Sequence, residues 1–150
     1  MKAYLRFGLM ILTSIVVMYV LMYFNTYSID HVTFSETRVY MAIMMGGFMA
    51  IIMMLFMLNM YKNKKANIAI LAASVLIIAG SLWLVRSQAT VGQVSYMRAM
   101  IPHHSIAIMT SERAHIEDPR VRKLADGIIE TQKKEIKEMK ALIKELKDKD

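Results

Sequence analysis

The sequence contains no cysteine, and this excludes a disulfide, a thiolate nucleophile and a zinc–thiolate centre. Because a chain without cysteine is compatible with either side of a membrane, its compartment is left open. We also find no nucleophile–base pair, phosphate-binding loop or pair of catalytic carboxylates, and we therefore predict that the protein is not an enzyme. Acidic residues are scarce before residue 110 and concentrated after it.

Hydrophobic residues make up 56% of the whole sequence, and long apolar runs occupy its first part. The runs cover about residues 5–24, 39–61 and 68–85. Twenty helical residues rise about 30 Å, the thickness of the hydrocarbon core of a bilayer. We therefore predict an all-α protein with a membrane domain over 1–89, embedded in the lipid bilayer, and a second helical domain over 90–150.

The first two runs carry further detail. The first ends at Tyr23-Phe24-Asn25-Thr26-Tyr27, without a small-x-small cleavage site, and this favours a retained span over a signal peptide. In the second, Gly46-Gly47 would let another helix approach closely. Its methionines at 41, 45, 49, 53 and 57 fit lipid-facing or interhelical packing, or alternatively a sulfur ladder for Cu(I).

Positive residues near the runs predict the orientation, since they favour the cytoplasmic side. One side would carry Lys2, Arg6, Lys62, Lys64 and Lys65, and the other Arg38 and Arg86. We expect a bacterial inner (plasma) membrane with the N-terminus in the cytoplasm and the C-terminal domain periplasmic. The net charge of +7 is partly explained by these flanking residues, and we predict no binding of nucleic acid.

The C-terminal domain reads as two amphipathic helices, over about 94–115 and 119–147. Pro102 would kink the first, and Asp118 would cap the second, with Pro119 at its first position. A two-helix hairpin cannot enclose a core by itself. We therefore predict a homodimer or higher oligomer in which a second copy completes a four-helix bundle.

Methionine and histidine gather on one face of the first of these helices. Met97, Met100 and His104 fall within a narrow arc, and His103 is turned by about 100° from His104. Antiparallel pairing about residues 117–118 brings Met139 near Met97. Thioether sulfur and imidazole nitrogen suit soft copper better than magnesium or calcium. The predicted metal ligands are Met97, Met100, His103, His104 and Met139, with Gln132 and Glu135 orienting an imidazole.

These residues carry a resemblance to a known family. The segment Met100-Ile101-Pro102-His103-His104, followed by Ala107-Ile108-Met109, Leu124-Ala125, Ile128-Ile129, Gln132, Glu135-Ile136 and Met139, resembles the domain of unknown function 305 family over roughly residues 94–146. The resemblance implies a ferritin-like helical fold outside the cytoplasm and copper binding through methionine and histidine, as in some periplasmic members. Some relatives carry two such hairpins in tandem, and this strengthens the expectation of a dimer.

Other interpretations stay open at this point. The methionines could simply fill gaps in a core. Glu112 and His115 have the Glu-x-x-His spacing of di-iron bundles. His31, alone in a polar loop, has no predicted role. The main hypothesis is a membrane-anchored protein that binds copper, or silver, for tolerance, buffering or delivery. The alternatives are a metal transport path through the second span and a metal-free interaction or scaffold protein.

Overall fold

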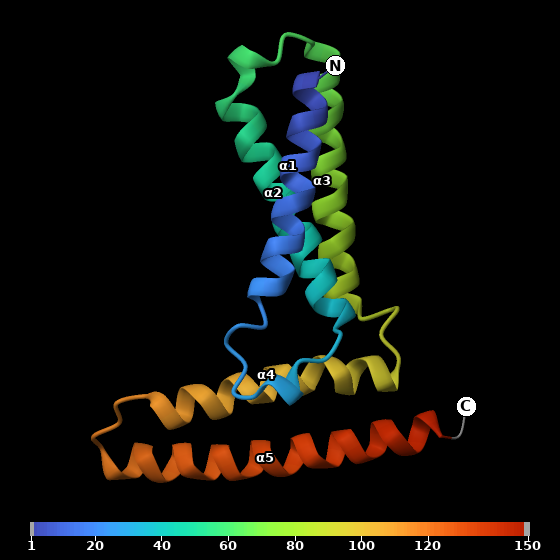
Figure 1. The fold of residues 1–150 in the computed structure, drawn as a ribbon. Helices are drawn as coiled ribbons and strands as arrows, with labels where there is room; N and C mark the ends of the chain where they lie inside the picture. The colour runs from blue at the N-terminus through green and yellow to red at the C-terminus, as the bar shows by residue number, and fades with distance from the viewer. Residues whose placement is uncertain (1, 149–150) are drawn as a thin grey trace. The chain divides into compact units, whose positions relative to one another are not determined.

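The computed structural model describes residues 2–148 and is entirely helical over that range (Figure 1). Its elements are α1 (Lys2–Leu21), η1 (Ile29–His31), α2 (Glu36–Phe56), η2 (Leu58–Met60), α3 (Lys64–Ser87), α4 (Gln93–Arg113) and α5 (Pro119–Lys147). The chain forms two compact units. The span unit contains the chain up to residue 22 and residues 37–90, and the hairpin unit contains residues 23–36 and the chain from 91 onward.

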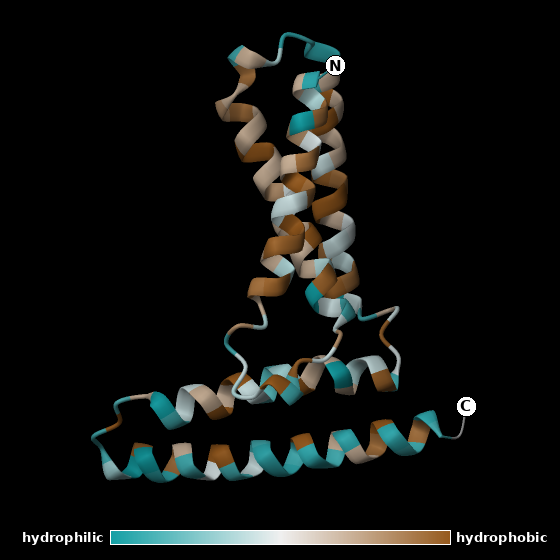
Figure 2. Cartoon of the chain, viewed as in Figure 1, coloured by the Kyte–Doolittle hydropathy of each residue, from teal (hydrophilic) through white to brown (hydrophobic). Residues whose placement is uncertain are grey.

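The three helices of the span unit, α1, α2 and α3, are long and apolar enough to cross a membrane. Figure 2 shows them mostly in the colours of hydrophobic residues, whereas hydrophilic and hydrophobic positions alternate along α5. The predicted 39–61 run does not form one helix. Helix α2 already ends at Phe56, and the short 3₁₀ helix η2 follows it. Asn63 caps α3 by accepting a hydrogen bond from the Ala66 N–H, so the chain must reverse before residue 63.

Glycine lets α2 approach both of its neighbours in the span unit, as predicted for Gly46-Gly47. A Cβ atom added at Gly47 would lie 2.8 Å from Ile78 Cγ1 and 3.3 Å from the Ser74 carbonyl oxygen, both in α3. A Cβ added at Gly46 would collide with the side chain of Ile15 in α1. The adjacent glycines therefore allow close packing against two different helices at one level of the bundle.

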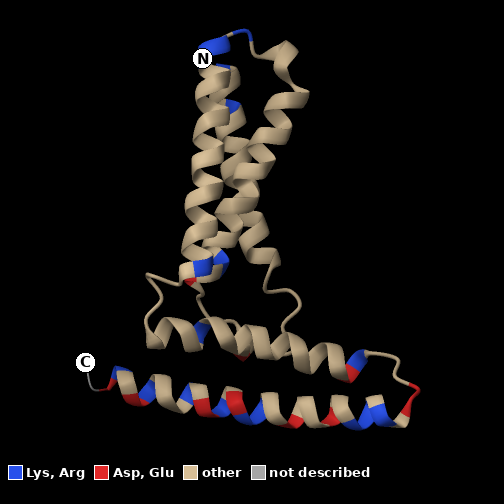
Figure 3. Cartoon of the chain, turned by 180° about the vertical axis from the view of Figure 1, so that it is seen from behind, with Lys and Arg blue, Asp and Glu red and all other residues tan. Residues whose placement is uncertain are grey.

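The start of α1 and the start of α3 lie at the same end of the span unit. Tyr4 Oη donates a hydrogen bond to Asn67 Oδ1 at 2.8 Å, and Asn67 Nδ2 donates to the Tyr61 carbonyl at 2.8 Å. The basic residues of the first run and of the 61–67 loop therefore share one end, and Arg38 and Arg86 belong to the other. Figure 3 shows the corresponding positive charge at both ends of these helices and almost none between.

The hairpin unit is built on α4 and α5, which pack antiparallel (Figure 1). Ile101, Ile108 and Ile136 form its buried core. The predicted start of α5 is confirmed, because the Asp118 side chain accepts from the Arg120 N–H and Pro119 is the first helical residue. Helix α4 runs without interruption through Pro102, which is buried.

Residues 23–36 form a strap that lies along α4 and belongs to the hairpin unit. The Tyr27 N–H donates to Ser105 Oγ at 2.8 Å, and His31 Nδ1 lies 2.9 Å from the same oxygen. Ser105 is completely buried beneath these contacts. His31, for which the sequence predicted no role, is therefore a packing residue in this unit.

Two further contacts hold the strap to α4 and α5. The Thr33 hydroxyl donates to the Arg98 carbonyl at 2.5 Å, two turns of α4 before Ser105. Asp30 pairs with Lys140 of α5 at 2.5 Å. Both helices thus gain a third layer on one side, which the sequence-based two-helix hairpin did not include.

Candidate metal centre

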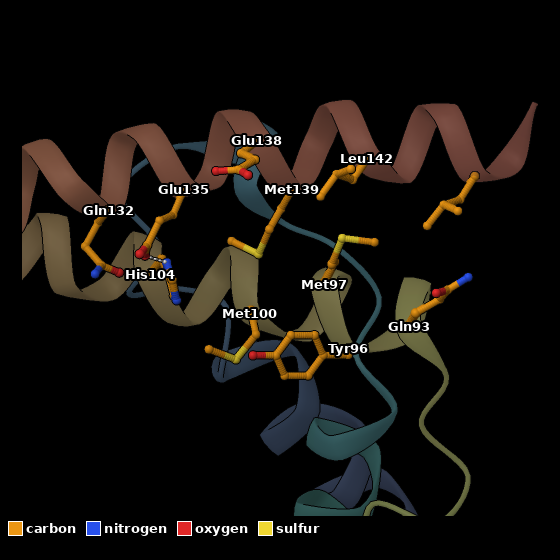
Figure 4. A pocket seen from close by; sticks show the side chains of 11 residues that line it. Gln93, Tyr96, Met97, Met100, His104, Gln132, Glu135, Glu138, Met139 and Leu142 are labelled. Atoms are coloured by element: carbon orange, nitrogen blue, oxygen red, sulfur yellow. Dashed lines mark ion pairs between the residues drawn. The ribbon is translucent and has the colours of Figure 1, made fainter.

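A groove of about 820 Å³ runs between α4 and α5. Its lining is mostly apolar, and the polar groups of His104, Gln132 and Glu135 lie together toward one end (Figure 4). The lining residues are Gln93, Tyr96, Met97, Met100, His104, Gln132, Glu135, Glu138, Met139, Leu142 and Leu146. Concave, mainly apolar sites with a few placed polar groups are typical of ligand-binding sites.

Three thioethers reach this groove from the two helices. Met97 is buried, while Met100 and Met139 are half-buried. Figure 4 shows Met97 and Met139 extending into the space between the helices and Met100 lying beside Tyr96. Helical spacing places Met97 and Met100 one turn apart on α4, and antiparallel pairing supplies Met139 from α5.

His104 provides the nitrogen donor of the groove. Its Nδ1 lies 3.1 Å from Glu135 Oε2, with the two side chains 14% and 44% exposed. The distance suits a charge-assisted contact, but the angles are not those of a hydrogen bond, and Nδ1 is buried without a hydrogen-bond partner among the described residues. Because Nδ1 faces the Glu135 carboxylate, a ligand would have to use the other ring nitrogen, Nε2.

The protonation state of His104 suits a ligand. Burial lowers its pKa below the usual 6.5, the positive charge that His103 can carry lowers it further, and the Glu135 carboxylate opposes both by raising it. The imidazole therefore remains neutral at pH 7 and keeps a lone pair for coordination. Glu135 is placed to orient that ring, in the way that carboxylates orient metal-binding histidines.

His103 does not share this groove. Its ring centroid is 6.0 Å from that of His104, its side chain is exposed, and it does not line the cavity. Of the predicted ligands, Met97, Met100, His104 and Met139 line the groove, as do Gln132 and Glu135, and Figure 4 shows the four donors spread along it, with Met100 turned toward Tyr96. The lining residues that the predicted site did not include are Gln93, Tyr96, Glu138, Leu142 and Leu146.

The Glu112–His115 spacing does not produce a di-iron motif. Helix α4 ends at Arg113, and Ala114 is extended with φ −66° and ψ 138°. His115 therefore lies beyond the helix, and the two side chains are not on one helical face. Glu112 Oε1 instead accepts from the Tyr27 hydroxyl at 3.4 Å.

The side chains that line the groove differ from the oxygen-rich ligand sets of hard cations. Within residues 2–148, no three His, Asp or Glu side chains gather as they would around a hard or borderline cation. What gathers instead is thioether sulfur with one imidazole, which suits a soft ion such as Cu(I). The groove residues fit copper or silver better than calcium, magnesium or zinc.

Comparison with known proteins gives two matches. The model of the family described as "Domain of unknown function (DUF305)" matches residues 90–150, which include all of α4 and α5. "Uncharacterized protein L153" from Acanthamoeba polyphaga mimivirus is 30% identical over 145 residues, covering 92% of this chain and 93% of that protein. No solved structure matches the chain. The relative's match extends over the apolar helices as well as the hairpin. The resemblance seen in the Met-His segment is confirmed, and the chain belongs to the family of proteins that carry this domain of unknown function.

Proposed function

We propose that the protein is a membrane-anchored metal binder that holds a soft ion, Cu(I) or Ag(I), in the groove between α4 and α5. Met97, Met100, His104 and Met139 would supply the donor atoms, and Glu135 would orient His104. The ion is cargo, held for tolerance, buffering or delivery. The observation that supports the proposal is that three thioethers and an imidazole line one groove in a chain without cysteine.

The span unit would anchor this module. Three helices of sufficient length and apolar composition support the proposal, as does the gathering of positive charge at their ends. The end that holds Lys2, Lys62, Lys64 and Lys65 would face the cytoplasm, and α4 and α5 would lie outside it. The relative is viral and does not support the bacterial membrane expected from the sequence. We therefore propose only which end of the helices faces the cytoplasm.

A second copy would cover the open side of the hairpin unit and complete four helices. The strap already covers one side, while Leu124 and Leu142 remain 65% and 41% exposed on the other. Helical hairpins bury such residues by packing against further helices.

The test is Cu(I) binding by the full-length protein in detergent or lipid nanodiscs, measured by competition with a Cu(I)-specific chelator. The double substitution His104→Ala with Met100→Leu should reduce the affinity by more than the ~10–100-fold expected from losing an orienting partner alone. His103→Ala is the matched control, since it removes an adjacent histidine that lies outside the groove. Equal affinity of the double variant and the wild-type protein would overturn the proposal, as would a larger loss in the His103 control.

A transport path is the second candidate. The evenly spaced methionines Met45, Met49 and Met53 of α2, and Met57 just after it, are half-buried, and Met53 and Met57 pack against the core of the span unit. Metal uptake by vesicles that is lost when Met45, Met49 and Met53 are replaced by leucine would favour it. A scaffold without metal would instead show no Cu(I) binding and no change in oligomeric state when copper is added.

A further inference from the structure

The formal charge of the chain is divided unevenly between its two units. The sequence of the span unit contains no aspartate or glutamate, so every acidic residue belongs to the hairpin unit, where basic residues balance them in number. The net charge of +7 is therefore the charge of the span unit alone. Its basic residues, none of which has a carboxylate partner within the unit, are Lys2, Arg6, Arg38, Lys62, Lys64, Lys65 and Arg86.

Five of these residues gather at one end of the unit. Tyr4 Oη accepts a hydrogen bond from the Asn63 N–H at 3.2 Å, and Lys62 and Lys64 flank Asn63 in the chain. Lys2 and Arg6 lie two residues before and after Tyr4, about 3 Å away along the axis of α1. Figure 3 shows this positive charge beside the N-terminus. We call this region the basic end; it consists of Lys2, Arg6, Lys62, Lys64 and Lys65.

Buried contacts hold the segments that carry the basic end. Tyr61, which is only 5% exposed, packs against the ring of Phe7 with 5.7 Å between centroids and against Tyr4 with 5.0 Å. The five basic side chains are themselves exposed. The charges are thus displayed from a backbone that is already docked, and a ligand has little chain to order when it binds.

The opposite end of the unit differs in number and in pairing. It carries two basic residues, Arg38 and Arg86, and the Arg38 Nη1 donates to the Met22 carbonyl oxygen. The asymmetry indicates that a negatively charged ligand would be held at the basic end.

The surroundings of the basic end favour a lipid over a nucleic acid. Helices α1 and α3, which are long and apolar enough to cross a membrane, both begin there. Clusters of four to eight basic residues directly beside a span attract anionic headgroups. Single-stranded nucleic acid would also need aromatic rings free for stacking. The rings of Tyr4 and Tyr61 instead pack against each other.

We propose that the basic end binds the headgroups of anionic phospholipids in the leaflet that surrounds it. The inference rests on the proposed membrane anchoring. It goes beyond the orientation of the helices, because the basic residues would hold lipid in the folded protein and would not act only while the chain inserts. The lipid is recognised by its net negative charge.

The test measures lipid preference with the full-length protein in phosphatidylcholine vesicles. Traces of spin-labelled phosphatidylglycerol or phosphatidylcholine report lipid at the protein surface as a motionally restricted signal in electron paramagnetic resonance. The two lipids share a phosphate group and differ in net charge. The variant is Lys62→Gln with Lys64→Gln and Lys65→Gln, and its matched control replaces the same three lysines with arginine. Arg86→Gln is the control for the other end.

Phosphatidylglycerol should associate about 2–5-fold more strongly than phosphatidylcholine, where fivefold corresponds to the roughly 1 kcal/mol that one basic residue contributes near a charged surface. The preference should fall as salt is added. It should also fall in the glutamine variant and remain in the arginine and Arg86→Gln controls. Lys2→Gln with Arg6→Gln gives a second measurement, from α1, if the glutamine variant does not fold.

The outcomes separate this inference from the membrane anchoring. If both labels are restricted equally in the wild-type protein, or if the preference persists in the glutamine variants, the inference is wrong and the anchoring stands. If neither label is restricted, the anchoring itself is wrong. Binding of a single-stranded RNA that is lost in the glutamine variant, without any preference for phosphatidylglycerol, would assign the basic end to nucleic acid and overturn the inference.

Discussion

The two sides of α4 are built from different contacts. On one side, Ser105 lies completely buried under hydrogen bonds from the strap. On the other, about 100° around the helix, His104 has a buried nitrogen with no hydrogen-bond partner among the described residues. Adjacent residues thus differ in whether their polar atoms are satisfied. The strap side holds the unit together, and the side that carries His104 lines the groove.

Removing the Ser105 hydroxyl should have the largest effect. Ser105→Ala leaves the Tyr27 N–H and His31 Nδ1 without their shared partner, and each buried unpaired group costs about 1–3 kcal/mol. We expect the hairpin unit to lose about 2 kcal/mol or more of stability, measured by denaturant unfolding or by protease cleavage within the strap, while Cu(I) affinity stays the same. Thr110→Ala is the control, because that exposed hydroxyl bonds only to carbonyls of its own helix. A loss of Cu(I) affinity in Ser105→Ala would show that the two sides of α4 are not independent.

Changing the other side should have the opposite pattern. Glu135→Gln removes the carboxylate beside His104 and should weaken Cu(I) binding by about 10–100-fold, or roughly 1.4–2.7 kcal/mol, with stability unchanged. Glu138→Gln is the matched control, since Glu138 lines the groove without contacting His104. Competition titrations of both variants decide the point, and equal affinities would mean that Glu135 does not act through His104.

Acid should have the smallest effect on the stability of the strap. Burial lowers the pKa of His31 below 6.5, Lys140 lowers it further, and Asp30 opposes them. The released strap therefore takes up a proton more readily than the docked one, so docking is complete above about pH 6.5 and weakens as the pH falls below that value. In hydrogen–deuterium exchange, the protection of residues 23–36 relative to the intrinsic base-catalysed rate should be lower at pH 5.5 than at pH 7.5. His31→Gln should remove this pH dependence, and an unchanged dependence would assign it to another group.

Much of the architecture follows from local sequence patterns. The apolar runs predict the three long helices, because only their length and composition matter. Asp118-Pro119 predicts the start of α5, since a capping side chain and a proline at the first position act within three residues. The methionine and histidine face of α4 follows from helical spacing in the same way.

The strap could not be predicted, because it depends on contacts between residues distant in the sequence. Tyr27 and Ser105 are 78 residues apart, and Asp30 and Lys140 are 110 apart. A serine on a helix and a histidine in a loop have no periodicity that marks them as partners. The ends of helices were also uncertain where no capping residue decides them: α2 ends at Phe56, and α4 ends at Arg113, before His115.

The paired glycines of α2 bear on how this family can vary. Gly46 and Gly47 face different neighbours at one height, so a side chain at either position would displace Ile15 or Ile78, or the helix that carries it. Substitution at either position would have to be accompanied by smaller residues at Ile15 or Ile78, or by a wider bundle. Members of the family that share the apolar helices should therefore change these sites in concert, and a member that lacks both glycines would have its first three helices arranged differently.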